Sequence, residues 1–158
     1  MIATFDADVL DETHRCPVCG QVLPYQVALF PFDAPCPACG VLPWCRISQQ
    51  DGSVILEVFP GREPSMEDIA SFIETYVRSN GHKSVLCDLS ELDMVSSSFV
   101  ARLLTLNKRL RSARCRFLVC GMGPVVGEVF SRLGLERLFE IADDKQDTVE
   151  RRQLAAIA

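Results

Sequence analysis

The sequence has few of the residues and motifs from which most enzyme active sites are built. Only two histidines occur, His14 and His82, and the second follows a predicted Asn-Gly turn, where we expect it to face solvent. No G-x-S-x-G run is present, and Gly121–Gly123 is too short to predict a nucleotide-binding loop. These absences argue against an enzyme.

The sequence also lacks long apolar runs and an excess of positive charge. No run approaches the ~20 apolar residues that span a bilayer, and residues 1–15 are acidic, unlike a secretory signal. We therefore expect a cytoplasmic protein with no membrane partner. The net charge of −5 at pH 7 disfavours nucleic acid as a partner. The 158 residues, 48% of them hydrophobic, are enough for one globular domain and a small appendage.

Cysteine, in contrast, is plentiful, and four of the eight cysteines form two Cys-x-x-Cys pairs. The pairs lie in the runs Cys16–Gly20 and Cys36–Gly40, with sixteen residues between Cys19 and Cys36. Two residues between thiolates let both sulfurs reach one ion, and in a reducing compartment such pairs bind metal more often than they form disulfides. The spacing predicts one tetrahedral site. Its predicted ligands are Cys16, Cys19, Cys36 and Cys39.

The cysteine pairs resemble those of zinc ribbons and, less closely, the iron site of rubredoxins. We expect residues 1–43 to form a zinc-ribbon-like module around a structural Zn²⁺, with iron as the less favoured metal. So small a segment has too little core to fold unaided, and a closed four-thiolate site supplies folding energy but no open position for chemistry. Cys45 is predicted to be a spare thiol and His14 a weaker alternative ligand. The predicted packing residues of the ribbon are Tyr25, Phe30 and Phe32.

From residue 44 to residue 158, short apolar runs alternate with amphipathic stretches. We expect strands at residues 44–48, 53–59, 84–89, 115–120 and 139–141, and helices at about 65–80, 96–111, 124–133 and 147–158. Because strands that alternate with helices need crossover connections, the prediction is an α/β domain with a mixed, mainly parallel sheet and an opening hairpin. No Gly/Ser linker separates this domain from the ribbon, so we expect rigid attachment.

Several side chains in this domain are predicted to be buried. The inert core thiols are Cys87, Cys115 and Cys120. The apolar stripe of the first helix is Met66, Ile69, Phe72, Ile73, Tyr76 and Val77. That of the third is Val125, Val126, Val129, Phe130 and Leu133.

Three consecutive serines, Ser96–Ser98, stand where the buried strand at 84–89 leads into an amphipathic helix. A helix start has unpaired N–H groups and a partial positive charge, so serine oxygens cap it and a phosphate there is partly stabilised. On these grounds alone the serines are either caps or a site for a phosphoryl group, and capping is the simpler interpretation.

From about Trp44 to Gln153 the order of elements and several residues resemble a STAS domain, the fold of bacterial anti-sigma factor antagonists and of sulfate-transporter tails. The matching residues are Val85–Ser90, the serine cluster, Phe117–Cys120, Pro124, Phe130, Gly134-Leu135 and Leu138-Phe139. The loop of that family reads Asp-Ser-Ser-Gly-Leu, and a partner kinase phosphorylates its first serine. In this sequence Ser96 takes the place of the Asp, Ser97 of the phosphoacceptor, Ser98 of the next serine and Phe99 of the Gly.

The resemblance implies a regulatory protein that binds an anti-sigma factor or a serine-kinase-like partner through Ser96, Ser98, Phe99 and the following helix. A phosphate on Ser97 would switch that contact. Because the Asp and the Gly of the family loop are absent, a scaffold or homodimer-forming STAS protein without phosphorylation is an alternative. A second alternative is a zinc-ribbon protein that binds nucleic acid or responds to redox conditions, which the negative charge and the lack of Lys and Arg between the cysteine pairs disfavour.

Overall fold

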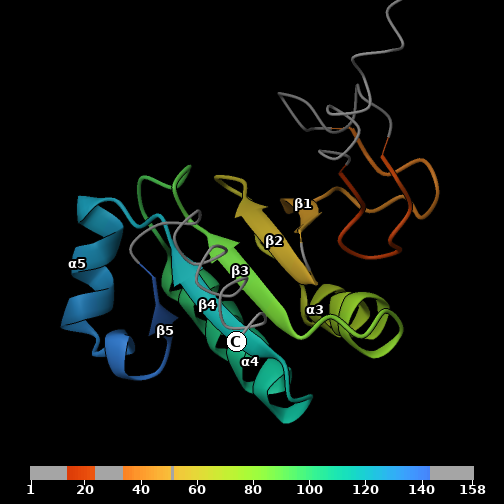
Figure 1. Cartoon of the computed structure of the whole chain (residues 1–158). Coiled ribbons are helices and arrows are strands. Elements are labelled where there is room, and N and C mark those ends of the chain that lie inside the picture. The colour runs from red at the N-terminus through yellow and green to blue at the C-terminus, as the bar shows by residue number, and fades with distance from the viewer. Residues whose placement is uncertain (1–13, 24–33, 51, 143–158) are drawn as a thin grey trace, which may run out of the picture.

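The computed structural model describes residues 14–23, 34–50 and 52–142 (Figure 1). Residues 1–13, the three predicted ribbon aromatics and the predicted helix at 147–158 lie outside the described residues.

A five-stranded sheet forms the centre of the described chain, and its spatial order follows the sequence (Figure 1). The strands are β1 (Cys45–Gln50), β2 (Ser53–Val58), β3 (Ser84–Asp88), β4 (Arg116–Cys120) and β5 (Glu140–Ile141). β1 and β2 pair antiparallel, and the other three pairings are parallel. The mixed, mainly parallel α/β sheet predicted from the sequence is therefore confirmed, with strand ends that differ by one or two residues.

Helical segments connect the parallel strands, as crossover connections require. They are α3 (Met66–Phe72), the π-helix η2 (Ile73–Arg78), α4 (Ser97–Ser112), α5 (Pro124–Arg132) and the 3₁₀ turn η3 (Leu135–Arg137). A capping box between Ser65 and Asp68 starts α3, as its sequence suggests. The helix predicted at about 65–80 is confirmed over residues 66–78, and its second half is wound as a π-helix, which the sequence pattern did not indicate.

The main core lies between one face of the sheet and the helices. Alternate strand residues such as Leu56, Cys87 and Val119 point to this face, where they join buried residues of α3, η2, α4 and α5. Strand residues that point to the opposite face of the sheet form a second, smaller buried cluster, together with Ala142 just after β5. Its members are Ile55, Leu86, Leu118, Cys120 and Ala142.

Most of the predicted buried residues are indeed buried. Cys87, Cys115 and Cys120 lie inside, and burial raises the pKa of Cys87, which keeps that thiol protonated and inert. Three predicted core residues are exposed instead: Met66 at 39%, Val125 at 56% and Leu133 at 61%. Met66 and Val125 stand in the first turns of their helices and Leu133 caps the end of α5, so the sheet does not cover them.

Candidate functional site

The serine cluster lies at the start of α4, after the loop that leaves β3. Ser96 is the N-cap residue, with extended backbone, and its hydroxyl oxygen accepts a hydrogen bond of 3.0 Å from the Phe99 N–H. Ser97 is the first helical residue. All three serines are exposed, and within the described residues the Ser97 hydroxyl makes no side-chain hydrogen bond. An unengaged hydroxyl thus stands at the positive end of a sixteen-residue helix.

Glu63, on the loop between β2 and α3, bridges the other two serines. The Ser96 hydroxyl donates to Glu63 Oε1 at 2.7 Å, and the Ser98 hydroxyl donates to Glu63 Oε2 at 2.6 Å. These bonds, that from Ser98 first, hold the pKa of the Glu63 carboxyl below its ordinary value, so Glu63 is ionised at neutral pH. Sequence reasoning missed Glu63, because no local pattern links it to serines more than thirty residues away.

Phe99 and two methionines complete the surroundings of the serines. The Phe99 side chain is buried in the main core, so this predicted member of the partner-binding loop does not present its ring to a partner. Met94, just before the cluster, is 74% exposed, and Met66, three residues after Glu63, is also exposed. The exposed groups at and just before the start of α4 thus include neutral hydroxyls, the carboxylates of Glu63 and Asp93, and the apolar Met94 side chain.

The four predicted metal ligands form a second cluster, in which all the sulfurs lie within 4.8 Å of one another. Cys16 Sγ lies 3.6 Å from Cys39 Sγ, and Cys19 Sγ lies 3.7 Å from Cys36 Sγ. Sulfurs bound about 2.3 Å from one zinc ion in a tetrahedron are about 3.8 Å apart, so the cluster fits such an ion. Cys45 lies in the main core and His14 contacts the Ile47 carbonyl of β1, so neither joins the cluster.

Each cysteine pair is folded as a tight turn, which we name the first knuckle (Cys16–Gly20) and the second knuckle (Cys36–Gly40). In the first knuckle, the N–H groups of Val18 and Cys19 point at Cys16 Sγ, at 3.4 and 3.5 Å. In the second, burial alone would raise the pKa of Cys36. The N–H groups of Cys39 and Ala38 and the neighbouring thiols outweigh this and lower it to about 7. The backbone N–H groups of both knuckles thus favour thiolate, the form that binds metal. In the first knuckle burial outweighs them, and the pKa values of Cys16 and Cys19 are raised above their ordinary value.

The first knuckle is docked on the STAS-like part of the chain. Tyr76 of η2 donates its buried hydroxyl to the Cys16 carbonyl at 2.6 Å, and Thr75 donates to the Val18 carbonyl at 2.9 Å. The Arg15 N–H donates to the Ile47 carbonyl of β1 at 3.2 Å. The π-helical turn thus coincides with the residues that hold the knuckle. Nothing in the sequence pattern distinguishes these two side chains from ordinary helix residues.

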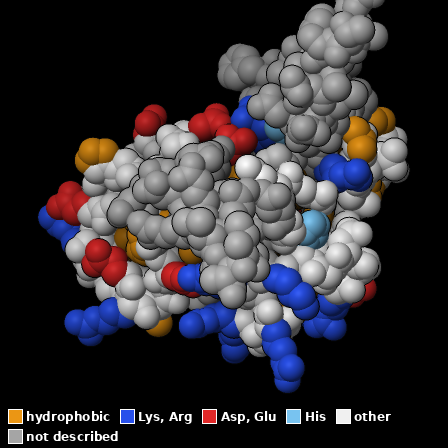
Figure 2. Space-filling model, viewed as in Figure 1, with side chains coloured by type: hydrophobic (Ala, Val, Ile, Leu, Met, Phe, Trp, Pro, Cys, Tyr) orange, Lys and Arg blue, Asp and Glu red, His pale blue; other side chains and the backbone are white. Residues whose placement is uncertain are grey.

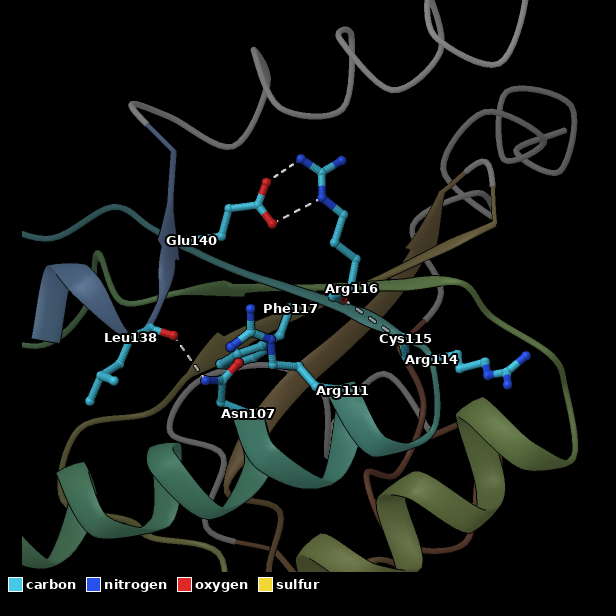
Figure 3. A pocket seen from close by; sticks show the side chains of 8 residues that line it. All are labelled: Asn107, Arg111, Arg114, Cys115, Arg116, Phe117, Leu138 and Glu140. Atoms are coloured by element: carbon cyan, nitrogen blue, oxygen red, sulfur yellow. Dashed lines mark hydrogen bonds and ion pairs between the residues drawn. The ribbon is translucent and has the colours of Figure 1, made fainter.

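Two hollows flank the C-terminal half of α4, away from the serines. One, of about 580 Å³, lies between η2 and α4 and includes Arg78, Lys108 and Arg109 in its lining. The other, of about 300 Å³, lies between α4, β4 and β5; Asn107 donates to the Leu138 carbonyl there, and Arg116 pairs with Glu140 (Figure 3). Lys and Arg side chains gather along the lower edge of the molecule in Figure 2. No predicted site residue lines either hollow.

Comparison with known proteins agrees with this architecture. The family model of the STAS domain matches residues 46–148. The chain belongs to the STAS domain family. No described helix is long and apolar enough to cross a membrane.

One curated relative is similar over part of this chain. BtrV of Bordetella bronchiseptica, whose name assigns it provisionally as an anti-sigma factor antagonist, is 32% identical over 66 residues. The match covers 42% of this chain and 57% of BtrV, so it spans little more than half of that relative.

Solved structures share the fold. A Thermotoga maritima protein, also provisionally assigned as an anti-sigma factor antagonist, superposes with a TM-score of 0.55 at 20% identity, covering 68% of this chain and 92% of that one. The anti-sigma factor antagonist SpoIIAA in its unphosphorylated form gives 0.53 at 18% identity, covering 69% and 96%. At these sequence identities the similarity shows a shared fold and nothing about function.

Proposed function

We propose that this protein is a regulatory interaction module that binds an anti-sigma factor or a serine-kinase-like partner through Ser96–Ser98 and α4. The observation that carries the proposal is the exposed Ser97 hydroxyl at the start of α4 in a STAS domain, which forms no side-chain hydrogen bond to any residue that the structure describes. Exposed Met94 and Met66 near the serines offer apolar surface for docking. The module has no catalytic role of its own, and we place it in the cytoplasm.

Phosphorylation of Ser97 is the proposed switch. The kinase's nucleoside triphosphate donates the phosphoryl group: Ser97 Oγ bonds to the terminal phosphorus, the bond to the nucleoside diphosphate breaks, and the hydroxyl proton passes to a base of the kinase. The phosphate adds about −1.5 to −2 charge in the middle of the docking surface. The helix N-terminus favours this charge and the ionised Glu63 beside the cluster opposes it. The exposed site lets solvent screen that repulsion, so the fold persists while docking is opposed by desolvation and repulsion.

A pull-down from the native cell tests the switch. Ser97→Ala is expected to retain the partner and Ser97→Asp to lose most of it, because only the second places charge at the docking surface. Ser131→Asp, an exposed serine on α5, is the matched control and should retain the partner. Equal retention by the Ser97→Ala and Ser97→Asp proteins would remove the switch.

For the cysteine cluster we propose a structural Zn²⁺ held by Cys16, Cys19, Cys36 and Cys39, in a module that ends near residue 43. A bound ion would supply folding energy to a segment that has little core of its own: its described apolar cluster consists of Cys16, Leu23 and Cys36, with Val18 and Val41 beside it. Elemental analysis of the purified protein is expected to give one zinc per chain. A red protein would indicate iron instead.

A STAS scaffold without phosphorylation is the second candidate function. Phe99 favours it, because this core-packed side chain replaces the glycine of the antagonist loop and fixes the start of α4. Such a scaffold would form a homodimer or a partner complex that neither Ser97 substitution weakens.

A further inference from the structure

We infer that Glu63 is a positioning residue that directs phosphorylation to Ser97 by holding the hydroxyls of Ser96 and Ser98. The inference rests on the proposed function, since it concerns the choice of serine by the partner kinase. It uses the juxtaposition of the β2–α3 loop with the start of α4, which no motif in the sequence encodes.

The three serines are adjacent and all exposed, so being exposed does not distinguish them. Their hydrogen bonds do. Ser96 Oγ accepts a hydrogen bond from the Phe99 N–H and donates one to Glu63. These two bonds occupy the hydroxyl proton and one lone pair of Ser96. Ser98 Oγ donates to the other Glu63 oxygen. To attack phosphorus, the hydroxyl of Ser96 or Ser98 must first break a short hydrogen bond to a charged acceptor. The Ser97 hydroxyl has no such bond to break among the described residues.

Glu63 also restores a negative charge that the sequence of the loop has lost. In the STAS antagonist loop an aspartate precedes the acceptor serine, and Ser96 stands at that position here. Glu63 brings a carboxylate to Ser96 from a different loop, and its two oxygens bind the residues on either side of Ser97. Arg102, one helix turn into α4, favours the ionised carboxylate. The carboxylate beside the acceptor is therefore supplied through the fold and not by the neighbouring residue.

The magnitude of the selection follows from the strength of these bonds. A hydrogen bond to a charged acceptor is stronger than one between neutral groups, so a hydroxyl that must first break such a bond is the poorer nucleophile. We expect roughly ten times more phosphate on Ser97 than on Ser96 or Ser98 in the wild-type protein.

The test is localisation of phosphate within the cluster by fragmentation mass spectrometry of the full chain purified from its native cell. Glu63→Ala frees both neighbouring hydroxyls and is expected to bring the three serines to within about threefold of one another. Glu63→Gln keeps one carbonyl acceptor without the charge and should give an intermediate ratio. Glu67→Ala removes an exposed carboxylate from the first turn of α3 and should leave the wild-type ratio unchanged.

A second pair of variants checks the same point without competition from Ser97. Ser97→Ala alone should carry little phosphate although two serines remain, and Ser97→Ala combined with Glu63→Ala should regain it on Ser96 or Ser98. If Glu63→Ala leaves the wild-type distribution intact, Glu63 does not select the serine and the proposed switch stands. If no variant carries phosphate in the cluster, the switch itself fails and the selection fails with it.

Discussion

Tyr76→Phe tests whether the metal module and the STAS domain are energetically coupled. The substitution keeps the ring that stacks on Phe72, with ring centroids 5.1 Å apart, and removes only the hydroxyl that donates to the Cys16 carbonyl. Burial raises the pKa of Tyr76, so this hydroxyl is a donor at every ordinary pH. The Cys16 carbonyl retains the Gly20 N–H at 3.1 Å as a partner. The loss is therefore one net hydrogen bond, about 1 kcal/mol of unfolding free energy.

A double-mutant cycle with Cys39→Ser measures the coupling, because this substitution removes an exposed, proposed ligand from the second knuckle and leaves Tyr76 unchanged. Urea unfolding can be followed by the fluorescence of Trp44, the single tryptophan, which is buried in the core. In the zinc-loaded protein we expect Tyr76→Phe to lower the free energy of unfolding by about 1 kcal/mol, or the melting temperature by about 2–4 °C. In the Cys39→Ser background the knuckle is released and the difference should shrink toward zero.

An equal loss in both backgrounds would refute this reasoning. It would mean that the first knuckle stays docked on η2 without a complete ligand set, and that the Tyr76 hydroxyl reports only on the local packing of the π-helix. Thr75→Val, which removes the bond to the Val18 carbonyl while keeping the shape of the side chain, should reproduce the Tyr76→Phe pattern.

Two further predictions concern the STAS domain itself. Gly121→Ala should destabilise the fold by more than about 2 kcal/mol, because Gly121 has φ +74° and an added Cβ would lie 2.3 Å from Asp88 Oδ1. Gly134 has φ +69°, with nothing within 4 Å of an added Cβ. Gly134→Ala should therefore lower the free energy of unfolding only by the added backbone strain, about 1 kcal/mol. Equal melting temperatures of the two variants would contradict the steric argument. Since the pKa of Glu63 is depressed in the folded state, its bridge to the serines should be complete above the unfolded glutamate pKa and should weaken as pH falls through the folded value. Carboxyl carbon NMR should show the Glu63 midpoint rising in Ser98→Ala, and an unchanged midpoint would show that the bridge does not form in solution.

The features that local sequence could predict are those that depend on spacing along the chain. Two Cys-x-x-Cys runs were enough to place four sulfurs together, because each run closes its own turn. Short apolar runs identified the buried strands, and β3 is buried at all five positions. The capping serine at position 96 was also visible in the sequence, since an N-cap is a local property of the residue and its next turn.

The features that sequence could not predict depend on contacts between distant segments. Glu63 meets Ser96 and Ser98 only because α3 and α4 pack on the same face of the sheet, which brings the two loops together. The π-helical turn at 73–78 coincides with bonds to the first knuckle, some sixty residues away for Tyr76 and Cys16. Helix periodicity alone also predicted burial for Met66, Val125 and Leu133, which are exposed. Periodicity identifies the apolar side of a helix but does not show where the sheet that covers it ends.

The bridge from Arg15 to Ile47 places the first knuckle on the outer strand of the sheet. An outer strand that loses its cover offers its backbone groups to any other extended chain. If the cluster holds the proposed zinc, chelation should reduce solubility first: self-association, seen by light scattering, should precede unfolding of the core that contains Trp44. Supply of the ion would in that case set how much of the protein remains available to its partner.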